Sequence, residues 1–240
     1  MIPIGDDNSD RIRTPFVNYI LIAVNIFVFI FYQKLGSDYS FTYSYSTVPA
    51  EILSGHDIVT DATVQIPGLG ITAFPVWLTL ITSMFMHGGI AHLAGNMLYL
   101  FVFGDNLEDR LGHLRYFFFY ILCGIIASLT HVISVFILDE NHLIPSLGAS
   151  GAISGAMGGY LLLFPHRRVT VFFIFTFIHV PAFIALGFWI LLQIANGTGY
   201  LGGSEASGIA YTAHIGGFIA GLVLIKRFHP KLKLRSYNGR

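Results

Sequence analysis

A small set of polar side chains lies inside long apolar stretches of the 240-residue sequence, and these side chains are the candidates for chemistry. Ionisable groups are costly in apolar surroundings, so by default they indicate function. The set contains histidine, asparagine and serine, but no Asp or Glu lies well inside a stretch. Its members are His87, His92, Asn96, His131, Ser150, His179 and His214, with Gln193 as a neutral addition.

This set favours serine with histidine over two other hydrolytic chemistries. A pair of aspartates sharing one proton is excluded, because Asp105 stands at the end of its apolar stretch without a partner. A zinc site of the His-Glu-x-x-His type is excluded because His87 and His92 are five positions apart with no Glu between them. Serine activated by histidine is the pairing that remains, and it needs neither a metal nor a cofactor.

The first motif is Gly148-Ala149-Ser150-Gly151. Glycines beside a serine permit a tight turn and the close approach of a substrate. Free N–H groups at the start of a helix favour a developing oxyanion. The alternative is helix packing, because glycines at positions 148, 151, 155 and 159 form a face of small residues. On the tetrapeptide alone, packing is the favoured interpretation.

The second motif places a histidine on a glycine-rich helical face. His214, Gly217 and Gly221 share this face by their spacing. The face can pack closely against the glycine face that follows Ser150 and so direct the histidine toward it. The alternative is a histidine that only hydrogen-bonds within a helix bundle.

The third motif is the pair His92 and Asn96, which lie four positions apart and hence on one helical face. Both side chains can donate a hydrogen bond without carrying a negative charge. A site that stabilises an oxyanion needs such donors. The alternative is a polar pair that holds helices together.

The three motifs are expected at one depth. Fourteen helical steps, roughly 21 Å, separate Ser150 from the end of its helix, and the same holds for His214. The corresponding rise from His92 is about 24 Å. This coincidence of depth favours catalysis over packing.

The elements that hold these residues are expected to be membrane helices, because the chain is too apolar for a soluble domain. Hydrophobic residues make up 54% and charged residues 11%, with a mean hydropathy of +0.69, whereas soluble domains carry about 25% charged residues. These numbers also exclude intrinsic disorder. The 13 basic and 13 acidic residues cancel, so no nucleic-acid partner is expected. The single Cys123 excludes an intramolecular disulfide framework.

The apolar stretches predict an all-α polytopic membrane protein with six transmembrane helices. The predicted spans are 15–33, 90–106, 116–138, 147–164, 170–195 and 213–228. Six spans put 12 basic residues on the side of both termini and only Lys34 on the other, which makes the N-terminus and the C-terminus cytoplasmic. We expect a cytoplasmic tail at 1–13 without a cleavable signal peptide, a membrane domain at 14–229 and a basic cytoplasmic tail at 230–240.

The segment 35–89 is expected to be one long extracytoplasmic segment. The alternative is a seventh span near 71–86, which would move two arginine-bearing loops to the outside, against the charge rule. We expect Ile71–Met86, with Trp77, to lie in the membrane interface or to dip into it.

With these motifs in this order, the chain resembles the rhomboid family of intramembrane serine proteases. The motifs are His92-x-x-x-Asn96, Gly148-Ala149-Ser150-Gly151 and Ala213-His214-x-x-Gly217-x-x-x-Gly221, on the expected helices and after a long first outer loop. The resemblance implies that Ser150 is the nucleophile and His214 its general base, in a dyad without an acidic member. It also implies that His92 and Asn96, with the backbone N–H of Ser150, form the oxyanion site.

The sequence departs from the family pattern at two places. Trp77 is followed by Leu78, where family members often carry a Trp-Arg pair. Ser154 stands four positions after the nucleophile, where many members have an aromatic residue that stacks on the catalytic histidine. The ring of His214 must therefore be oriented by another group.

The resemblance implies a serine endopeptidase that cleaves transmembrane protein substrates in a lipid bilayer. It further implies a bacterial plasma (inner) membrane location, with the active site open to the extracytoplasmic side. A rhomboid-like protein that binds transmembrane helices without cutting them is one alternative, but it would be expected to have lost Ser150 or His214. A transporter is another, and it would show charged pore residues and internal symmetry, neither of which is visible.

The sequence also supports predictions for four other features. Pro181 is expected to kink the fifth helix, with His179 bonding the backbone that the kink frees, or serving as a gate. The glycine-rich linker 196–212 is expected to be either a lid or an ordinary loop. His131 is expected to be structural, and His87 is a candidate for the mouth of the cavity.

Overall fold

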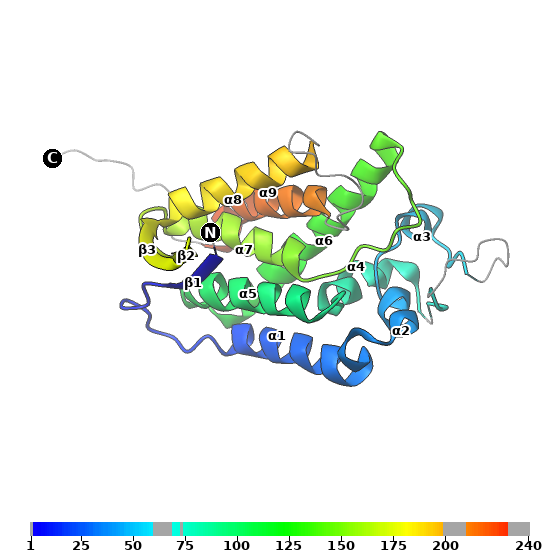
Figure 1. The fold of residues 1–240 in the computed structure, drawn as a ribbon, viewed down its shortest axis with the longest axis horizontal. Coiled ribbons are helices and arrows are strands. Elements are labelled where there is room, and N and C mark those ends of the chain that lie inside the picture. Colours follow the sequence, from blue (N-terminus) through cyan, green and yellow to red (C-terminus); the bar gives the residue numbers. More distant parts are fainter. Residues whose placement is uncertain (1, 60–68, 73, 199–209, 230–240) are drawn as a thin grey trace.

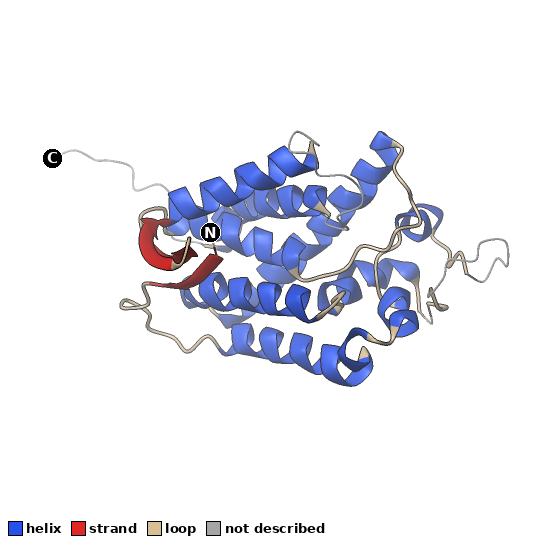
Figure 2. Cartoon of the chain, in the orientation of Figure 1, coloured by secondary structure: helices blue, strands red, loops and turns tan. Residues whose placement is uncertain are grey.

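The long apolar stretches of the sequence form helices that lie side by side along the long axis of the molecule (Figure 1). The computed structural model describes residues 2–59, 69–72, 74–198 and 210–229. Helices dominate it, and the strands are confined to one end (Figure 2). The long helices are α1 (Phe16–Phe27), continued by a π-helical segment at Val28–Tyr32, α5 (Ile90–Leu111), α6 (His113–Leu138), α7 (Ser150–Leu163), α8 (Ala182–Gly197) and α9 (Tyr211–Phe228).

Length and hydropathy identify the described helices that could cross a membrane. Among the described helices, α6 is long and apolar enough to cross a membrane by itself. The segment Val76–Phe85 and helix α5 meet the same criterion when taken together, although they are bent by 82°. Shorter apolar helices occupy Phe16–Tyr32, Ser150–Leu163 and Ala182–Gly197. The architecture is a helical bundle of the kind expected, and the six-span topology stays a prediction.

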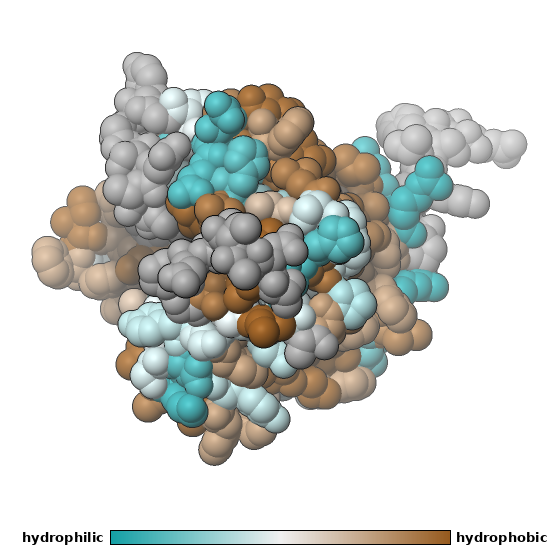
Figure 3. Space-filling view, turned by 90° about the vertical axis from the view of Figure 1, so that its right-hand side faces the viewer, coloured by the Kyte–Doolittle hydropathy of each residue, from teal (hydrophilic) through white to brown (hydrophobic). Residues whose placement is uncertain are grey.

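Short helices cover the end of the bundle where α5, α7 and α9 begin (Figure 1). They are the 3-10 helix Lys34–Gly36, α2 (Tyr39–Ser44), α3 (Pro49–Ser54), the 3-10 helix Val76–Leu78, α4 (Thr79–Thr82) and the 3-10 helix Ser83–Phe85. Figure 3 looks onto this end, where hydrophobic and hydrophilic residues are interspersed.

Gln33 anchors this region to the bundle. Its buried amide donates to Thr42 Oγ1 at 2.9 Å and to the carbonyl of His87 at 2.8 Å. Its oxygen accepts the N–H of His87 at 3.0 Å. Since His87 lies just before α5, these bonds fix the short helices at the end of the bundle where α5 begins.

The predicted helix at 170–195 is wrong over 170–181, nearly half of its length. Residues Arg168–Phe173 form strand β2 and residues Thr176–Pro181 form strand β3, paired antiparallel from Phe173 opposite Thr176 to Arg168 opposite Pro181. The stretch is rich in β-branched and aromatic residues, which suit a strand. Pro181 also disfavours a helical conformation for the residue before it, so the helix can begin only after the proline.

This hairpin also corrects the expectation for His179. His179 lies in β3, where its Nδ1 is 2.9 Å from Thr170 Oγ1 on β2. Pro181 precedes the first residue of α8 with an extended ψ of 144°. The proline therefore starts a helix instead of kinking one, and no backbone group is freed for the histidine.

The N-terminal segment is also more ordered than the expected polar tail. Residues Ile2–Asp6 form strand β1, which pairs antiparallel with β2 and completes a three-stranded sheet in the order β1-β2-β3. The chain is therefore not all-α, because this sheet closes one end of the bundle (Figure 2). The expected tail at 230–240 lies outside the described residues.

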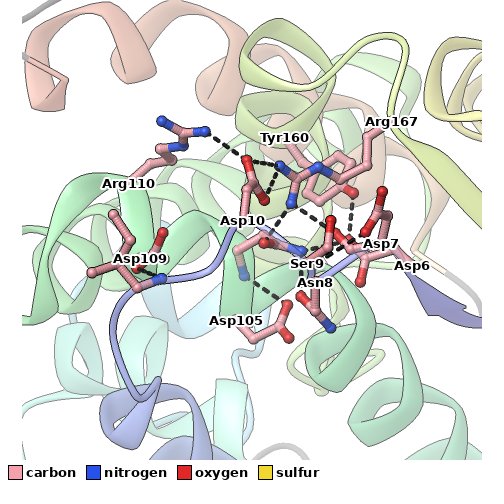
Figure 4. A network of polar contacts seen from close by, with 12 residues as sticks. Asp6, Asp7, Asn8, Ser9, Asp10, Asp105, Asp109, Arg110, Tyr160 and Arg167 are labelled. Atoms are coloured by element: carbon pink, nitrogen blue, oxygen red, sulfur yellow. Dashed lines mark hydrogen bonds and ion pairs between the residues drawn. The ribbon is translucent and has the colours of Figure 1, made fainter.

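Ion pairs fasten the residues after β1 to the same end of the bundle (Figure 4). Asp10 contacts Arg110 at 3.0 Å and Arg167 at 2.6 Å. Arg11 contacts Asp105 at 2.6 Å. Asp105 thus has a cationic partner, which the sequence did not reveal.

Glycines allow α7 and α9 to approach with their backbones nearly in contact. A Cβ added at Gly217 would overlap the carbonyl oxygen of Gly151, and one added at Gly221 would overlap that of Gly155. Such small-residue faces are how membrane helices pack closely. The predicted packing of the two glycine faces is confirmed, and it brings the beginnings of α7 and α9 together.

Candidate active site

The close packing of α7 and α9 places Ser150 and His214 in direct contact. Ser150 is the first residue of α7, and His214 is in the first turn of α9. Ser150 Oγ and His214 Nε2 are 2.8 Å apart. Both residues are half-buried. Ser150 and His214, which the helical rise predicts at a similar depth, are therefore in contact in the structure.

The second ring nitrogen of His214 faces Gln193 of α8. Gln193 Oε1 lies 2.8 Å from His214 Nδ1. A carbonyl oxygen only accepts hydrogen bonds, so Nδ1 must donate. In the neutral ring, Nε2 then has the free lone pair and accepts the hydroxyl hydrogen of Ser150. This is the arrangement that a general base requires.

The group that orients His214 comes from α8 and not from α7. Ser154 Oγ donates to the carbonyl of Ser150 at 2.6 Å and is fully buried, so it is occupied within its own helix. Trp189 on α8 lies against the imidazole instead, with ring centroids 5.8 Å apart and planes inclined by 37°. Tyr211 meets the same ring edge-on at 6.5 Å.

Gly148 lies where α5 comes close to the backbone before the serine. Its φ of +120° lies in the region that favours glycine. A Cβ at this position would come within 2.8 Å of His92 Nε2 and 3.6 Å of Asn96 Nδ2. Both predicted oxyanion residues of α5 therefore face the backbone just before Ser150.

The hydrogen bonds of His92 and Asn96 show which of their atoms can donate. His92 Nδ1 accepts the N–H of Gly88 at 3.3 Å, so the proton of a neutral ring resides on Nε2, the atom that faces Gly148. Asn96 Nδ2 is buried and has no hydrogen-bond partner among the described residues. Two donors thus point toward the same small space.

The remaining histidines do not join this site directly. His87 is fully buried and meets His92 edge-on at 5.2 Å, so the expectation that it lines a cavity mouth is wrong. His131 Nδ1 lies 3.1 Å from Thr212 Oγ1 and links α6 to α9. His179 lies in the sheet at the opposite end. The linker 196–212, expected to be either a lid or an ordinary loop, falls largely outside the described residues.

Sequence reasoning missed the role of α8. The pattern of polar residues marks Gln193 only as a neutral addition and does not mark Trp189. The two are four positions apart, so they share one face of α8. That pairing of an amide with an aromatic ring was the available signal.

The chain belongs to the rhomboid family: the rhomboid domain matches residues 75–231, more than half of its length. The Rhomboid protease GluP of Bacillus subtilis is 35% identical over 149 residues, covering 62% of this chain and 26% of the relative. The mitochondrial Rhomboid protein 1 of Saccharomyces cerevisiae is 33% identical over 147 residues, covering 61% and 40%. The putative rhomboid protease YdcA of Bacillus subtilis is 39% identical over 93 residues, covering 38% and 44%.

The chain thus spans less than half the length of these relatives. They include mitochondrial and bacterial proteins. Family membership therefore establishes a protein of the rhomboid type, a family that is integral to membranes.

Proposed function

We propose that the chain is a serine endopeptidase that cleaves transmembrane segments with Ser150 as nucleophile and His214 as general base. The observation that supports this most directly is the 2.8 Å contact between Ser150 Oγ and His214 Nε2. The acceptor role of Nε2, set by Gln193, supports it further. No metal or cofactor is needed for this chemistry.

The reaction starts when Ser150 Oγ attacks a backbone carbonyl carbon of the substrate and His214 Nε2 takes the hydroxyl proton. The carbonyl oxygen becomes an oxyanion, and His92 Nε2–H, the Asn96 amide and the N–H of Ser150 donate to it. When the C–N bond breaks, the imidazolium returns the proton to the leaving amine. Water then hydrolyses the acyl-enzyme by the same steps, with His214 again as base.

The proposed topology has six spans, formed by α1, α5, α6, α7, α8 and α9, with both termini in the cytoplasm. Residues 14–229 form the membrane domain between the tails 1–13 and 230–240. The fourteen residues of α7 are about 21 Å long, which is shorter than a bilayer core of about 30 Å. Ser150 would then lie below the extracytoplasmic face of a bacterial plasma membrane, with water reaching it from that side.

Reconstitution with a model transmembrane substrate tests the proposed function. We expect Ser150→Ala and His214→Ala to abolish cleavage. Ser154→Ala is the matched control, because it removes a serine hydroxyl one turn along the same helix that bonds only to the backbone. It is expected to cleave at nearly the wild-type rate. Cleavage that persists in Ser150→Ala would refute the assignment.

Covalent labelling distinguishes the proposed enzyme from a rhomboid-like protein that only binds helices. A serine-reactive phosphonate should label Ser150 in the wild type, since His214 activates its hydroxyl. Labelling should be lost in His214→Ala. A wild-type protein that binds the substrate but is neither labelled nor active would favour the non-catalytic alternative.

A further inference from the structure

We infer that Gln193 is a positioning residue that holds His214 in its base form, so that α8 supplies the third member of the site. This inference rests on the proposed function, in which His214 acts as base. It adds a residue from a third helix to the Ser150 and His214 pair.

Both ring nitrogens of His214 have a hydrogen-bond partner. His214 Nε2 meets Ser150 Oγ, and His214 Nδ1 meets Gln193 Oε1, both at 2.8 Å. In the described part of the chain, Nδ1 has this one hydrogen-bond acceptor. The oxygen of Gln193 is therefore the group that decides the tautomer of the ring.

The other neutral tautomer of His214 could not act as a base toward Ser150. If the proton resided on Nε2, the ring would direct a donor at Ser150 Oγ and could not accept its hydrogen. A neutral imidazole without a partner at Nδ1 is free to adopt that form. In the serine proteases with a buried aspartate, changing that aspartate to asparagine leaves the geometry intact but lowers kcat by about 10⁴-fold, because the histidine takes the wrong tautomer. An amide therefore fixes the productive tautomer only when its oxygen faces Nδ1, as Gln193 Oε1 does here.

Residues of α8 hold the ring of His214 in its orientation. Ser154 has no ring that could stack on His214, and its hydroxyl donates to the carbonyl of Ser150. Trp189, one turn before Gln193 on α8, lies against the ring at 5.8 Å and also against Phe218 at 6.3 Å. One face of α8 therefore supplies both the ring contact and the hydrogen bond to Nδ1.

Three variants separate this role from simple space filling. Gln193→Met keeps the length of the side chain but removes the acceptor. Gln193→Glu keeps an acceptor that cannot turn a donor toward the ring. Asn196→Leu is the matched control on the same helix, because the Asn196 amide donates to the carbonyl of Leu192 and not to the site.

The variants are compared in liposomes by kcat and KM for a model transmembrane substrate, and by the phosphonate labelling rate of Ser150. Gln193→Met is expected to lower kcat and the labelling rate together, by as much as the roughly 10²- to 10⁴-fold that a positioned general base contributes, with little change in KM. Gln193→Glu is expected to stay far more active than Gln193→Met. The acidic limb of its kcat profile should move to higher pH, because a carboxylate stabilises the imidazolium. Asn196→Leu is expected to match the wild type.

The activities of the two Gln193 variants decide whether Gln193 positions His214. The inference is overturned if Gln193→Met is as active as the wild type, or if Gln193→Met and Gln193→Glu are equally impaired with an unmoved pH profile. In both cases the proposed function stands as long as Ser150→Ala is inactive. If Ser150→Ala cleaves, the proposed function fails first. Thermal unfolding of each variant in detergent identifies any loss that comes from misfolding.

Discussion

At the scale of single residues, Asn96 carries an unusual cost. Its Nδ2 is buried without a partner in the described part of the chain, and a buried donor left unpaired costs about 1–3 kcal/mol. A cost of this kind needs an explanation, and a role in donating to a transient oxyanion provides one. The residue is thus expected to matter more for the reaction than for the fold.

Asn96→Ala tests this distinction. Loss of one oxyanion donor is expected to lower kcat about 10²- to 10³-fold, while thermal stability stays level or rises because an unpaired donor is removed. Kinetics in liposomes and thermal unfolding in detergent measure the two quantities. Asn18→Ala is the control, because Asn18 is also buried but its amide donates to the carbonyl of Leu100 at 3.0 Å and accepts from the Tyr116 hydroxyl at 2.7 Å. It should lose stability and keep its kcat. The reverse pattern would contradict the role of Asn96.

Residue types and spacing were enough to select Ser150, His214, His92 and Asn96 as candidates. They were not enough for Gln193, because a hydrogen bond to one nitrogen of a ring depends on a rotamer in the folded protein. The burial of His87 was equally out of reach. It follows from the Gln33 bonds to its backbone, which join positions 54 residues apart.

At the scale of elements, the close approach of α7 and α9 connects packing with chemistry. His214 lies one turn before Gly217, and Gly217 lies against the backbone of Gly151, the residue after Ser150. The distance between the proposed nucleophile and base is therefore set by a contact between two backbones. A change in that contact should be felt in both stability and activity.

Gly217→Ala is expected to push the two helices apart. Overpacking of this kind costs about 1–3 kcal/mol, and the accompanying shift should lengthen the Ser150–His214 contact and lower kcat. Gly187→Ala on α8 is the matched control, since an added Cβ there meets nothing within 4 Å. It should be neutral or stabilising by about 0.5–1 kcal/mol, because alanine favours a helix over glycine. Equal melting temperatures and rates for both variants would show that the α7–α9 contact is not tight.

The sheet is the element that the sequence concealed. Residues 169–195 contain no Asp, Glu, Lys or Arg, so no charged residue separated the hairpin from α8. The turn offered no glycine either: Ile174 and Phe175 adopt positive φ values of 43° and 65°. The β-branched pattern and Pro181 were the available indications, and the expectation of a long span outweighed them.

At the scale of the whole molecule, the N-terminal segment acts as a fastening at one end of the bundle (Figure 4). The Asp6 carboxylate accepts hydrogen bonds from Tyr160 of α7 and Asn106 of α5. Burial raises the pKa of Asp6 to about 7, with the charge of Asp105 acting in the same direction and Arg167 opposing it. Protonation of Asp6 therefore contributes to holding the N-terminal segment against α5 and α7.

The sign of the pH effect follows from that shift. The folded protein binds the Asp6 proton more tightly than the unfolded chain, whose pKa is near 3.8. This stabilising contribution is fully present below about pH 4 and is lost as the pH rises through about 7. We expect the melting temperature of the wild type, relative to Asp6→Asn, to fall across this window when measured by thermal unfolding in detergent.

Asp7→Asn is the neighbouring control. Asp7 is exposed, and hydrogen bonds from Ser9 lower its pKa, so its small contribution has the opposite pH dependence. A flat difference between wild type and Asp6→Asn from pH 4 to 8 would show that Asp6 does not titrate in the folded protein.

The pairing of β1 with β2 also dictates an order of events during synthesis. Ile2 pairs with Phe172, so the first strand has no partner until about 170 further residues have been made. Contacts between such distant positions form slowly, because a long loop must close first. Strand β1 is thus among the last elements to reach its place, and the end of the bundle that the sheet closes stays open until α7 and the hairpin have been made.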